Sequence, residues 1–276
     1  MGFDPEAMRA FERARWERAA GRYEASFATA TRQFIPALLD AADVGDGAVG
    51  ADHRVLDICC GPGFVAAAAA SQGATATGVD FSQAMLVVAR ARHGALAFDQ
   101  GDAEALPYPD ASFDAAASNF GIHHVPHPVA ALREAYRVLR PGGRLAFTIW
   151  AAPAENIAWK LLFDAIARHG DPSASDAPAP GGGFSTPAQC LAALGAPGFA
   201  AAETHIVRAR WRHRDGAAMV AALQAGTARM AALIEAQDPA ALPAIIADIE
   251  RHAADWRDAD GLAVPIAAIV ATGRKP

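Results

Sequence analysis

The stretch VLDICCGPGF, residues 55–64, brings one acid, two adjacent cysteines and two glycines into a short loop. Glycine at positions 61 and 63 lets the backbone approach a ligand closely, and the helix expected to follow offers free N–H groups at its first turn. Pro62 stiffens the loop. A Gly-x-Gly loop after a strand occurs in several nucleotide-binding folds, so the loop alone leaves the ligand open.

Two acids further along the chain narrow the choice of ligand. Asp80 ends the apolar run ATGVD, about 20 residues beyond the loop, where a carboxylate can accept hydrogen bonds from both hydroxyls of a ribose. Asp102 follows the next run, within FDQGDAEALPYP, where it can accept from an exocyclic amino group. One acid placed for a ribose and another placed for adenine together indicate a site for an adenosine group without phosphates.

Residues 54–150 alternate apolar runs with helical patterns, which predicts an α/β fold. The strand-like runs are RVLDI, ATGVD, LAFDQ, FDAAASN and RLAFTIW, and helices are expected over 64–72, over 82–92 and within HPVAALREAYRVLRPGG. This alternation predicts a doubly wound, mostly parallel sheet with helices on both faces. Ligands bind such sheets at the carboxyl ends of the strands. We therefore expect Asp57, Asp80, Asp102 and Asn119 to converge there, because each lies at or just after a predicted strand end.

The segments that flank this core follow other patterns. Helical spacing of apolar residues predicts a helix over residues 5–42, with the charged run ERARWER, residues 12–18, forming a solvated face. Beyond Trp150 we expect a helix over 154–169, a strand at ETHIVRARW, two or three alanine-rich helices within 215–257 and a final buried strand at VPIAAIVATGRK.

Composition argues against several classes of function. The net charge is −6 in 276 residues, so a cationic surface for nucleic acid is not expected. Three cysteines are typical of a reducing compartment, and no apolar run reaches the roughly 18 residues that span a bilayer. The charged N-terminus does not resemble a signal peptide. These features predict a cytoplasmic protein without a membrane span.

The motifs together resemble those of class I S-adenosylmethionine-dependent methyltransferases, in particular the broad group similar to ubiquinone/menaquinone and small-molecule methyltransferases. The resemblance is carried in order by VLDICCGPG, GVDFSQAML, GDAEALPYPDASFD, SNFGIHHVPHP and REAYRVLRPGGRLAF. It implies a Rossmann-like, seven-stranded sheet and S-adenosyl-L-methionine as cofactor. It also implies site roles: the loop from Asp57 through Gly61 to Gly63 for the methionine end, Asp80 for the ribose, Phe81 and Met85 beside the adenine, Asp102 and Ala103 at its edge, and Asn119 and Phe120 at the methyl-transfer site.

The same resemblance implies three parts of the chain. Residues 1–50 would form a helical N-terminal lid, residues 51–153 the cofactor-binding core, and residues 154–276 the acceptor-side helical cap with the last two strands of the sheet. Tyr23 on the lid would close over the sulfonium, with plain packing of its helix as the alternative. The chain departs from the family at Cys59, where glycine or alanine is frequent, so the loop must accept a small side chain there.

The histidines of GIHHVPHP are candidates for acid–base chemistry. His123 or His124 could act as general base beside the acceptor, because imidazole titrates near neutral pH. The alternative is that they pack against the cofactor or cap the next helix. No metal site is expected, since neither these histidines nor the adjacent Cys59 and Cys60 complete four ligands. The cysteines are interpreted as small side chains packed under the loop.

The sequence thus predicts an enzyme that methylates a small, apolar or aromatic metabolite by direct displacement. An aromatic acceptor is suggested by Trp211, His213, Met219, Met230 and Trp256 as a set, with cap packing as the alternative for each. Two other functions stay open: an NAD-dependent Rossmann oxidoreductase, and a cofactor-binding protein without catalysis. A pyrophosphate site gives no reason for the GDA segment at residues 101–103, which weakens the first of these.

Overall fold

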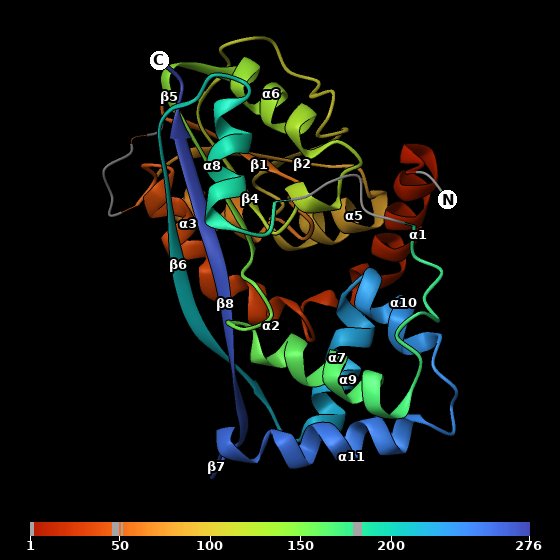
Figure 1. Cartoon of the computed structure of the whole chain (residues 1–276). Coiled ribbons are helices and arrows are strands. Elements are labelled where there is room, and N and C mark those ends of the chain that lie inside the picture. Colours follow the sequence, from red (N-terminus) through yellow and green to blue (C-terminus); the bar gives the residue numbers. More distant parts are fainter. Residues whose placement is uncertain (1–2, 46–49, 51, 179–183) are drawn as a thin grey trace.

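The computed structural model describes residues 3–45, 50, 52–178 and 184–276. In this part of the chain, eight strands form a single sheet in the order β3-β2-β1-β4-β5-β8-β6, with β7 paired beside β8 (Figure 1). The strands are β1 (Arg54–Ile58), β2 (Thr75–Asp80), β3 (Ala97–Gln100), β4 (Phe113–Asn119), β5 (Leu139–Trp150), β6 (Ala200–His213), the two-residue β7 (Arg257–Asp258) and β8 (Gly261–Arg274).

The first five strands run parallel, and β8 lies antiparallel between β5 and β6. Strand β1 pairs with β2 on one side and with β4 on the other, so the strand order reverses there. The carboxyl ends on both sides of this reversal form the crevice in which open α/β sheets bind ligands. The predicted Rossmann-like, mostly parallel fold is confirmed, and the short β7 is an addition to its seven long strands.

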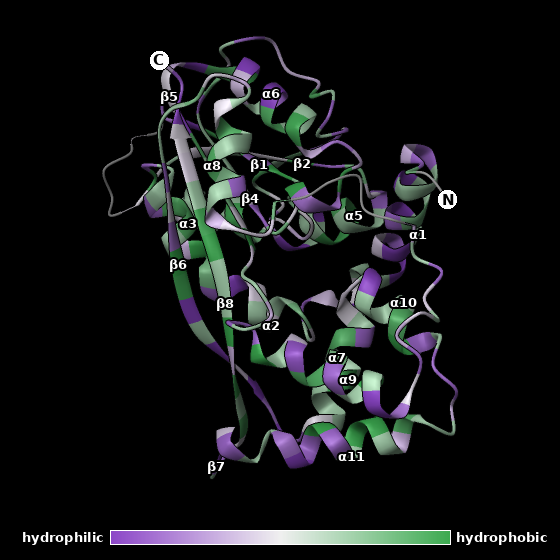
Figure 2. Cartoon of the chain, in the orientation of Figure 1, coloured by the Kyte–Doolittle hydropathy of each residue, from purple (hydrophilic) through white to green (hydrophobic). Residues whose placement is uncertain are grey.

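Helices cover both faces of the sheet. The helices are α1 (Pro5–Tyr23), α2 (Ala28–Thr31), α3 (Ile35–Ala41), α4 (Phe64–Ser71), α5 (Gln83–Arg92), α6 (Pro128–Val138), α7 (Ile157–His169), α8 (Pro187–Gly195), α9 (Gly216–Gly226), α10 (Arg229–Glu235) and α11 (Leu242–His252), with 3₁₀ turns η1 (Arg32–Phe34), η2 (Ile122–His124) and η3 (Ala254–Trp256). Buried residues of α3, α4 and α5 form one core and those of α6 and α8 another. Strand β8 is apolar along most of its length (Figure 2), because both of its faces are covered.

A third apolar cluster joins the C-terminal helices to the far half of the long strands. Helices α7, α9 and α11 pack around Trp211 of β6, which is fully buried and donates from Nε1 to Thr29 Oγ1 at 2.7 Å. In Figure 1 these helices lie below the part of the sheet that contains β1, β2 and β4. The alanine-rich helices expected within 215–257 are therefore present as α9, α10 and α11.

The N-terminal segment is not the continuous helix expected over residues 5–42. Helix α1 begins after Asp4, whose side chain accepts from the N–H groups of Glu6 and Ala7, and it ends at Tyr23. A turn then leads into α2, η1 and α3. The break separates α1, which packs against α5 and α9, from α3, which packs against the sheet.

Among the described residues, no single helix is both long and apolar enough to cross a membrane. The pair α9 and α10 meets that length and composition only when taken together, across a bend of 118°.

Candidate active site

A pocket opens at the carboxyl ends of β1, β2 and β4, where the strand order reverses. Its wall includes the glycine loop after β1, the acid that ends β2, the segment after β3 and the end of β4. Helix α1 closes another side through Arg9, Trp16 and Tyr23. The predicted convergence of strand-end residues is therefore present, with the N-terminal helix laid across it.

The glycine loop turns through backbone conformations that favour glycine. Gly61 and Gly63 have φ of +51° and +79°, and a Cβ on Gly63 would approach the Phe98 ring to 2.6 Å. Gly63 itself precedes α4 and does not line the pocket, so its role is to make the turn. Cys59 also has a positive φ, +57°, which is strained for a residue with a side chain.

Asp57 lies beneath this loop and is almost completely buried. Its Oδ2 accepts from the Ala66 N–H of α4 at 2.9 Å, and the residue lines the pocket. Burial raises the pKa of Asp57 to about 8, an effect that the single N–H partner does not offset. A positive charge beside Asp57 would favour the ionised form of this buried acid, so the site is suited to a cationic ligand group.

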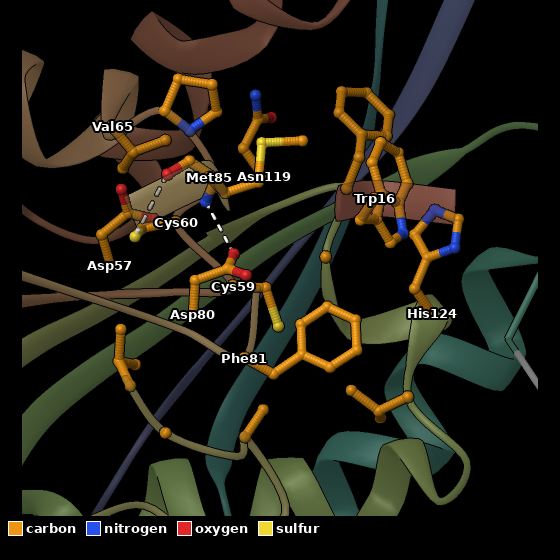
Figure 3. Close-up of a pocket in the computed structure, with 18 of the residues that line it drawn as sticks. Trp16, Asp57, Cys59, Cys60, Val65, Asp80, Phe81, Met85, Asn119 and His124 are labelled. Carbon is orange, nitrogen blue, oxygen red and sulfur yellow. Dashed lines mark hydrogen bonds between the residues drawn. The ribbon is translucent and has the colours of Figure 1, made fainter. Parts of the chain in front are cut away.

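Asp80 connects the ends of β1 and β2. Its two oxygens accept from the N–H groups of Gly61 and Ser82, each at 2.8 Å, and Figure 3 shows the first of these bonds. Burial raises the pKa of Asp80 to about 6. Both oxygens keep a further lone pair, so a ligand diol can be accepted at the pocket side.

The four residues that the sequence places beside adenine all line the pocket: Phe81, Met85, Asp102 and Ala103. Asp102 accepts from the Glu104 N–H at 2.9 Å through one oxygen and pairs with Arg9 of α1 through the other. Arg9 also reaches Glu104 at 2.7 Å. We call these contacts of Arg9 with Asp102 and Glu104 the Arg9 clamp. The sequence did not indicate it, because Arg9 and Asp102 are 93 positions apart.

At the opposite end, Asn119 and Phe120 line the pocket with their conformations set by neighbours. The Asn119 Nδ2 donates to the Thr31 carbonyl at 3.0 Å, and its Oδ1 accepts from Thr148 Oγ1 at 2.7 Å. Phe120 has φ of +58° and stacks on Trp150 with ring centroids 4.0 Å apart. These contacts make a rigid wall.

Three side chains from α1 and η2 complete this wall. Tyr23 hydrogen-bonds Thr31 Oγ1 at 3.0 Å, and burial raises its pKa to about 12. The rings of Trp16 and His124 meet edge to face with centroids 5.0 Å apart. Figure 3 shows these two across the pocket from Asp57 and Asp80.

The two histidines proposed as bases differ in position. His124 lines the pocket, whereas His123 is not among the lining residues, and burial lowers the pKa of His123 well below its usual value. His124 Nδ1 lies 3.0 Å from the Glu12 carboxylate. Glu12 belongs to the run ERARWER and is fully buried, so the expectation of a solvated face is wrong at this position.

Sequence reasoning missed Glu12 because its partners lie elsewhere in the chain. One feature of the sequence could have indicated a partner for Glu12: it lies four residues before Trp16, on the same face of the helix. In the structure Trp16 Nε1 donates to Glu12 Oε2 at 3.1 Å.

The cysteines do not offer reactive thiolates. Burial raises the pKa of both Cys59 and Cys60, and the nearby carboxylates add to the effect.

The residues of the pocket fit S-adenosylmethionine on chemical grounds. Asp57 and Asp80 present buried carboxylates to the pocket, and the recorded hydrogen bonds to them come from backbone N–H groups. Such a set of acceptors fits a cation that carries a ribose diol, because a positive charge favours ionisation of the buried acids and the diol hydroxyls can donate to the free lone pairs. A pyrophosphate would add negative charge beside two acids, which disfavours a dinucleotide.

Comparison with known proteins agrees with this chemistry. Residues 56–147 match the model of a methyltransferase domain. Within residues 56–147 the chain therefore carries a methyltransferase domain of the class I, S-adenosylmethionine-dependent type. Domains of this class use S-adenosyl-L-methionine as methyl donor.

The relatives of this methyltransferase domain are similar over part of their length. A demethylmenaquinone methyltransferase of Paenarthrobacter aurescens is 37% identical over 133 residues, which are 48% of this chain and 50% of that protein. A malonyl-[acyl-carrier protein] O-methyltransferase of Erwinia billingiae is 39% identical over 132 residues, or 43% of this chain and 53% of that protein. The chain thus spans about half the length of these relatives.

A solved structure extends the likeness of the fold beyond the methyltransferase domain. The YcgJ protein of Bacillus subtilis has a TM-score of 0.57 at 21% identity, over 88% of this chain and 98% of that one. At this identity the match concerns the fold alone. The matched segment 56–147 begins within β1 and ends within β5, so it contains the strand-end acids and His124 but not α1.

Proposed function

We propose that the protein transfers a methyl group from S-adenosyl-L-methionine to a small, apolar or aromatic metabolite. The observation that carries this proposal is the pocket in which Asp57, Asp80 and Asp102 meet at the carboxyl ends of neighbouring strands. The methyltransferase-domain match over residues 56–147 supports it. The names of the two relatives add that similar domains methylate a quinone precursor and an acyl-carrier-bound malonyl group.

The cofactor supplies a methyl group already activated on a sulfonium, so the protein's main task is alignment. In our proposal the loop from Asp57 to Gly61 holds the methionine end, and Asp80 accepts from the ribose hydroxyls. Asp102 and Ala103 meet the adenine edge. Restraint of this kind contributes roughly 7–11 kcal/mol in well-oriented reactions.

The wall formed by Tyr23, Asn119 and Phe120 faces the reacting end in this proposal. His124 is the favoured general base because it lines the pocket, and His123 is the weaker candidate because it does not. The remaining wall of the acceptor space is assigned to residues 1–50 and 154–276. Trp211 and Met219 are fully buried within the cap, which supports packing as their role.

Ligand binding tests the cofactor assignment before any acceptor is known. S-adenosylhomocysteine is expected to bind in titration calorimetry and to raise the melting temperature, whereas NADH is not. Binding of NADH alone would instead favour the oxidoreductase.

The ribose assignment has a sharper test in the ligand itself. The wild type is expected to bind S-adenosylhomocysteine at least 10-fold more tightly than its 2′-deoxyribose analogue, since a lost hydrogen bond to a charged group costs about 1.5–3 kcal/mol. In Asp80→Asn this preference should shrink, while Asp255→Asn, an exposed control, keeps it. An unchanged preference in Asp80→Asn would refute the assignment.

Turnover separates an enzyme from a cofactor-binding protein without catalysis. Radiolabelled methyl transfer to a panel of phenols, quinols and acyl thioesters is expected to label one class. Binding of S-adenosylhomocysteine with no transfer to any panel member would favour the non-catalytic alternative.

A further inference from the structure

The N-terminal helix contributes a buried carboxylate to the wall of the pocket. Glu12 is fully buried, and its oxygens accept from three side chains. Oε2 lies 3.0 Å from His124 Nδ1 and 3.1 Å from Trp16 Nε1, and Oε1 accepts from Arg229 Nε at 2.9 Å. A single carboxylate thus ties α1 to η2 and to α10.

Glu12 and Arg229 form a pair of opposite charges within this cluster. Glu12 carries one negative charge and Arg229 one positive charge. Burial alone would raise the pKa of Glu12, but His124 and Arg229 outweigh it and keep that pKa below its ordinary value. The carboxylate therefore stays ionised, so the contact at His124 Nδ1 is an N–H group that donates to it.

The hydrogen bond at Nδ1 determines which nitrogen is free. When a carboxylate holds Nδ1–H, the lone pair of a neutral imidazole is on Nε2. In the described part of the chain, no recorded hydrogen bond involves His124 Nε2, and the residue lines the pocket. Trp16, held by the same carboxylate, packs edge to face on the imidazole and fixes its plane.

We propose that Glu12 is a positioning residue that holds His124 in the tautomer with Nε2 free, and that the acceptor is a conjugated hydroxyl compound that loses its proton to that nitrogen. This inference rests on the proposed function. The hydroxyl proton passes to Nε2, the oxygen forms a bond with the methyl carbon, and the electron pair of the broken carbon–sulfur bond remains on sulfur. The resulting imidazolium lies beside Glu12, which stabilises its charge.

The aromatic wall supports a flat acceptor of this kind. Trp16, Tyr23 and Phe120 all line the same pocket as His124, and Trp16 contacts its ring. Aromatic side chains bind planar rings by stacked and edge-to-face contacts. A hydroxyl on such a ring gives up a proton more readily than an aliphatic alcohol, so a base of the strength of imidazole suffices.

The tautomer can be measured without cofactor or acceptor. Long-range ¹H–¹⁵N spectra of the histidine ring, assigned with His124→Asn, are expected to show the proton of neutral His124 on Nδ1. The double variant E12M/R229M removes the carboxylate together with its counter-charge, which limits the cost of leaving one buried charge unpaired. In that variant the proton should move to Nε2 in most of the population.

Matched controls separate positioning from general damage. Glu6→Gln changes an exposed acid of the same helix and should leave the tautomer unchanged. Trp16→Phe removes the indole N–H while keeping a ring, and it should also keep the proton on Nδ1. Binding of S-adenosylhomocysteine should change less than about 3-fold in Glu6→Gln and in E12M/R229M, because Glu6, Glu12 and Arg229 are not part of the pocket lining and less than about 1 kcal/mol of binding energy is at stake.

The outcomes distinguish this inference from the proposed function. A wild-type His124 protonated on Nε2, or a double variant with an unchanged tautomer, would overturn the role of Glu12 even if S-adenosylhomocysteine binds. Failure of the wild type to bind S-adenosylhomocysteine would overturn the proposed function whatever the tautomer.

With a labelled phenol as acceptor, E12M/R229M is expected to lose at least about 100-fold in kcat with an unchanged KM for S-adenosylmethionine. An equal loss of kcat in Glu6→Gln would refute the positioning role of Glu12.

Discussion

Gly121 has no room for a side chain because Cys59 occupies the space that its Cβ would need. A Cβ built on Gly121 would overlap the Cβ of Cys59 and stand 2.9 Å from Ser118 Oγ. The two residues follow β4 and β1, the strands that flank the reversal of the sheet order. Their contact therefore sets how closely the glycine loop approaches the wall formed by Asn119 and Phe120.

Gly121→Ala is accordingly expected to lower the free energy of unfolding by about 1–3 kcal/mol, as overpacking does, and to weaken binding of S-adenosylhomocysteine. Chemical denaturation and calorimetry measure the two effects. Cys59→Gly removes the clashing Cβ and relieves the positive φ of +57°. The double variant should recover most of the lost stability, and a double variant as unstable as Gly121→Ala would contradict the proposed contact.

Asp57 makes the ligand-free protein less stable as the pH rises. Burial raises its pKa to about 8, so the folded state keeps the proton that the unfolded chain releases near pH 4. The free energy of unfolding therefore falls as the pH rises from about 4 to about 8. Asp57→Asn should be more stable than the wild type at pH 8, by on the order of 2 kcal/mol, with a smaller difference at pH 5.

Denaturation at both pH values checks this prediction, with Asp255→Asn as an exposed control. The amide oxygen that Asp57→Asn introduces can still accept from the Ala66 N–H, so the loop should keep its support. A gain in stability that is equal at the two pH values would show that ionisation of Asp57 is not its cause.

Arg9 is expected to slow the release of the cofactor. It joins α1 to Asp102 and Glu104 over the proposed adenine end, and two partly exposed ion pairs contribute roughly 1 kcal/mol in total. Arg9→Gln should therefore raise the dissociation rate of S-adenosylhomocysteine about 5-fold. Stopped-flow fluorescence of Trp16, which lines the pocket, can follow release.

Salt provides the internal check for this clamp. High ionic strength should accelerate release from the wild type and have less effect on Arg9→Gln, because screening weakens the same ion pairs. Arg18→Gln changes a more exposed arginine of α1 and should behave like the wild type. Equal salt dependence in all three proteins would count against the clamp.

Tyr23 should remain protonated throughout the range in which enzymes of this kind work. Burial raises its pKa to about 12, so its phenolate does not form below about pH 11. At pH 10.5, roughly at the ordinary pKa of tyrosine, the wild type and Tyr23→Phe should show the same phenolate absorbance. A larger signal in the wild type would make Tyr23 a candidate base beside His124.

The strand-end acids show what could be predicted from sequence. Asp57, Asp80 and Asp102 each follow an apolar run, and parallel strands joined by right-handed crossovers must bring such positions to a common edge. The identity of the ligand, S-adenosyl-L-methionine, was predicted from the resemblance of the motifs to those of a methyltransferase family. Cys59 was also expected to fit the loop, and the structure adds the positive φ that it adopts there.

The helix break after Tyr23 could not be predicted, since apolar spacing continues through it. The buried state of Glu12 was equally inaccessible. A charged residue in a charged run favours a solvated face unless partners are supplied, and its partner Arg229 is 217 positions away. The choice between His123 and His124 likewise depended on which side of η2 faces the pocket.

The sequence by itself determined the sheet, the glycine loop and the acids at its edge, because these follow from local periodicity and from the geometry of parallel strands. Only the tertiary structure decided how α1 lies across that edge. That placement depends on long-range contacts of Arg9 and Glu12 with segments far along the chain. Such contacts stabilise a charge only after folding has brought both partners together, so no local pattern records them.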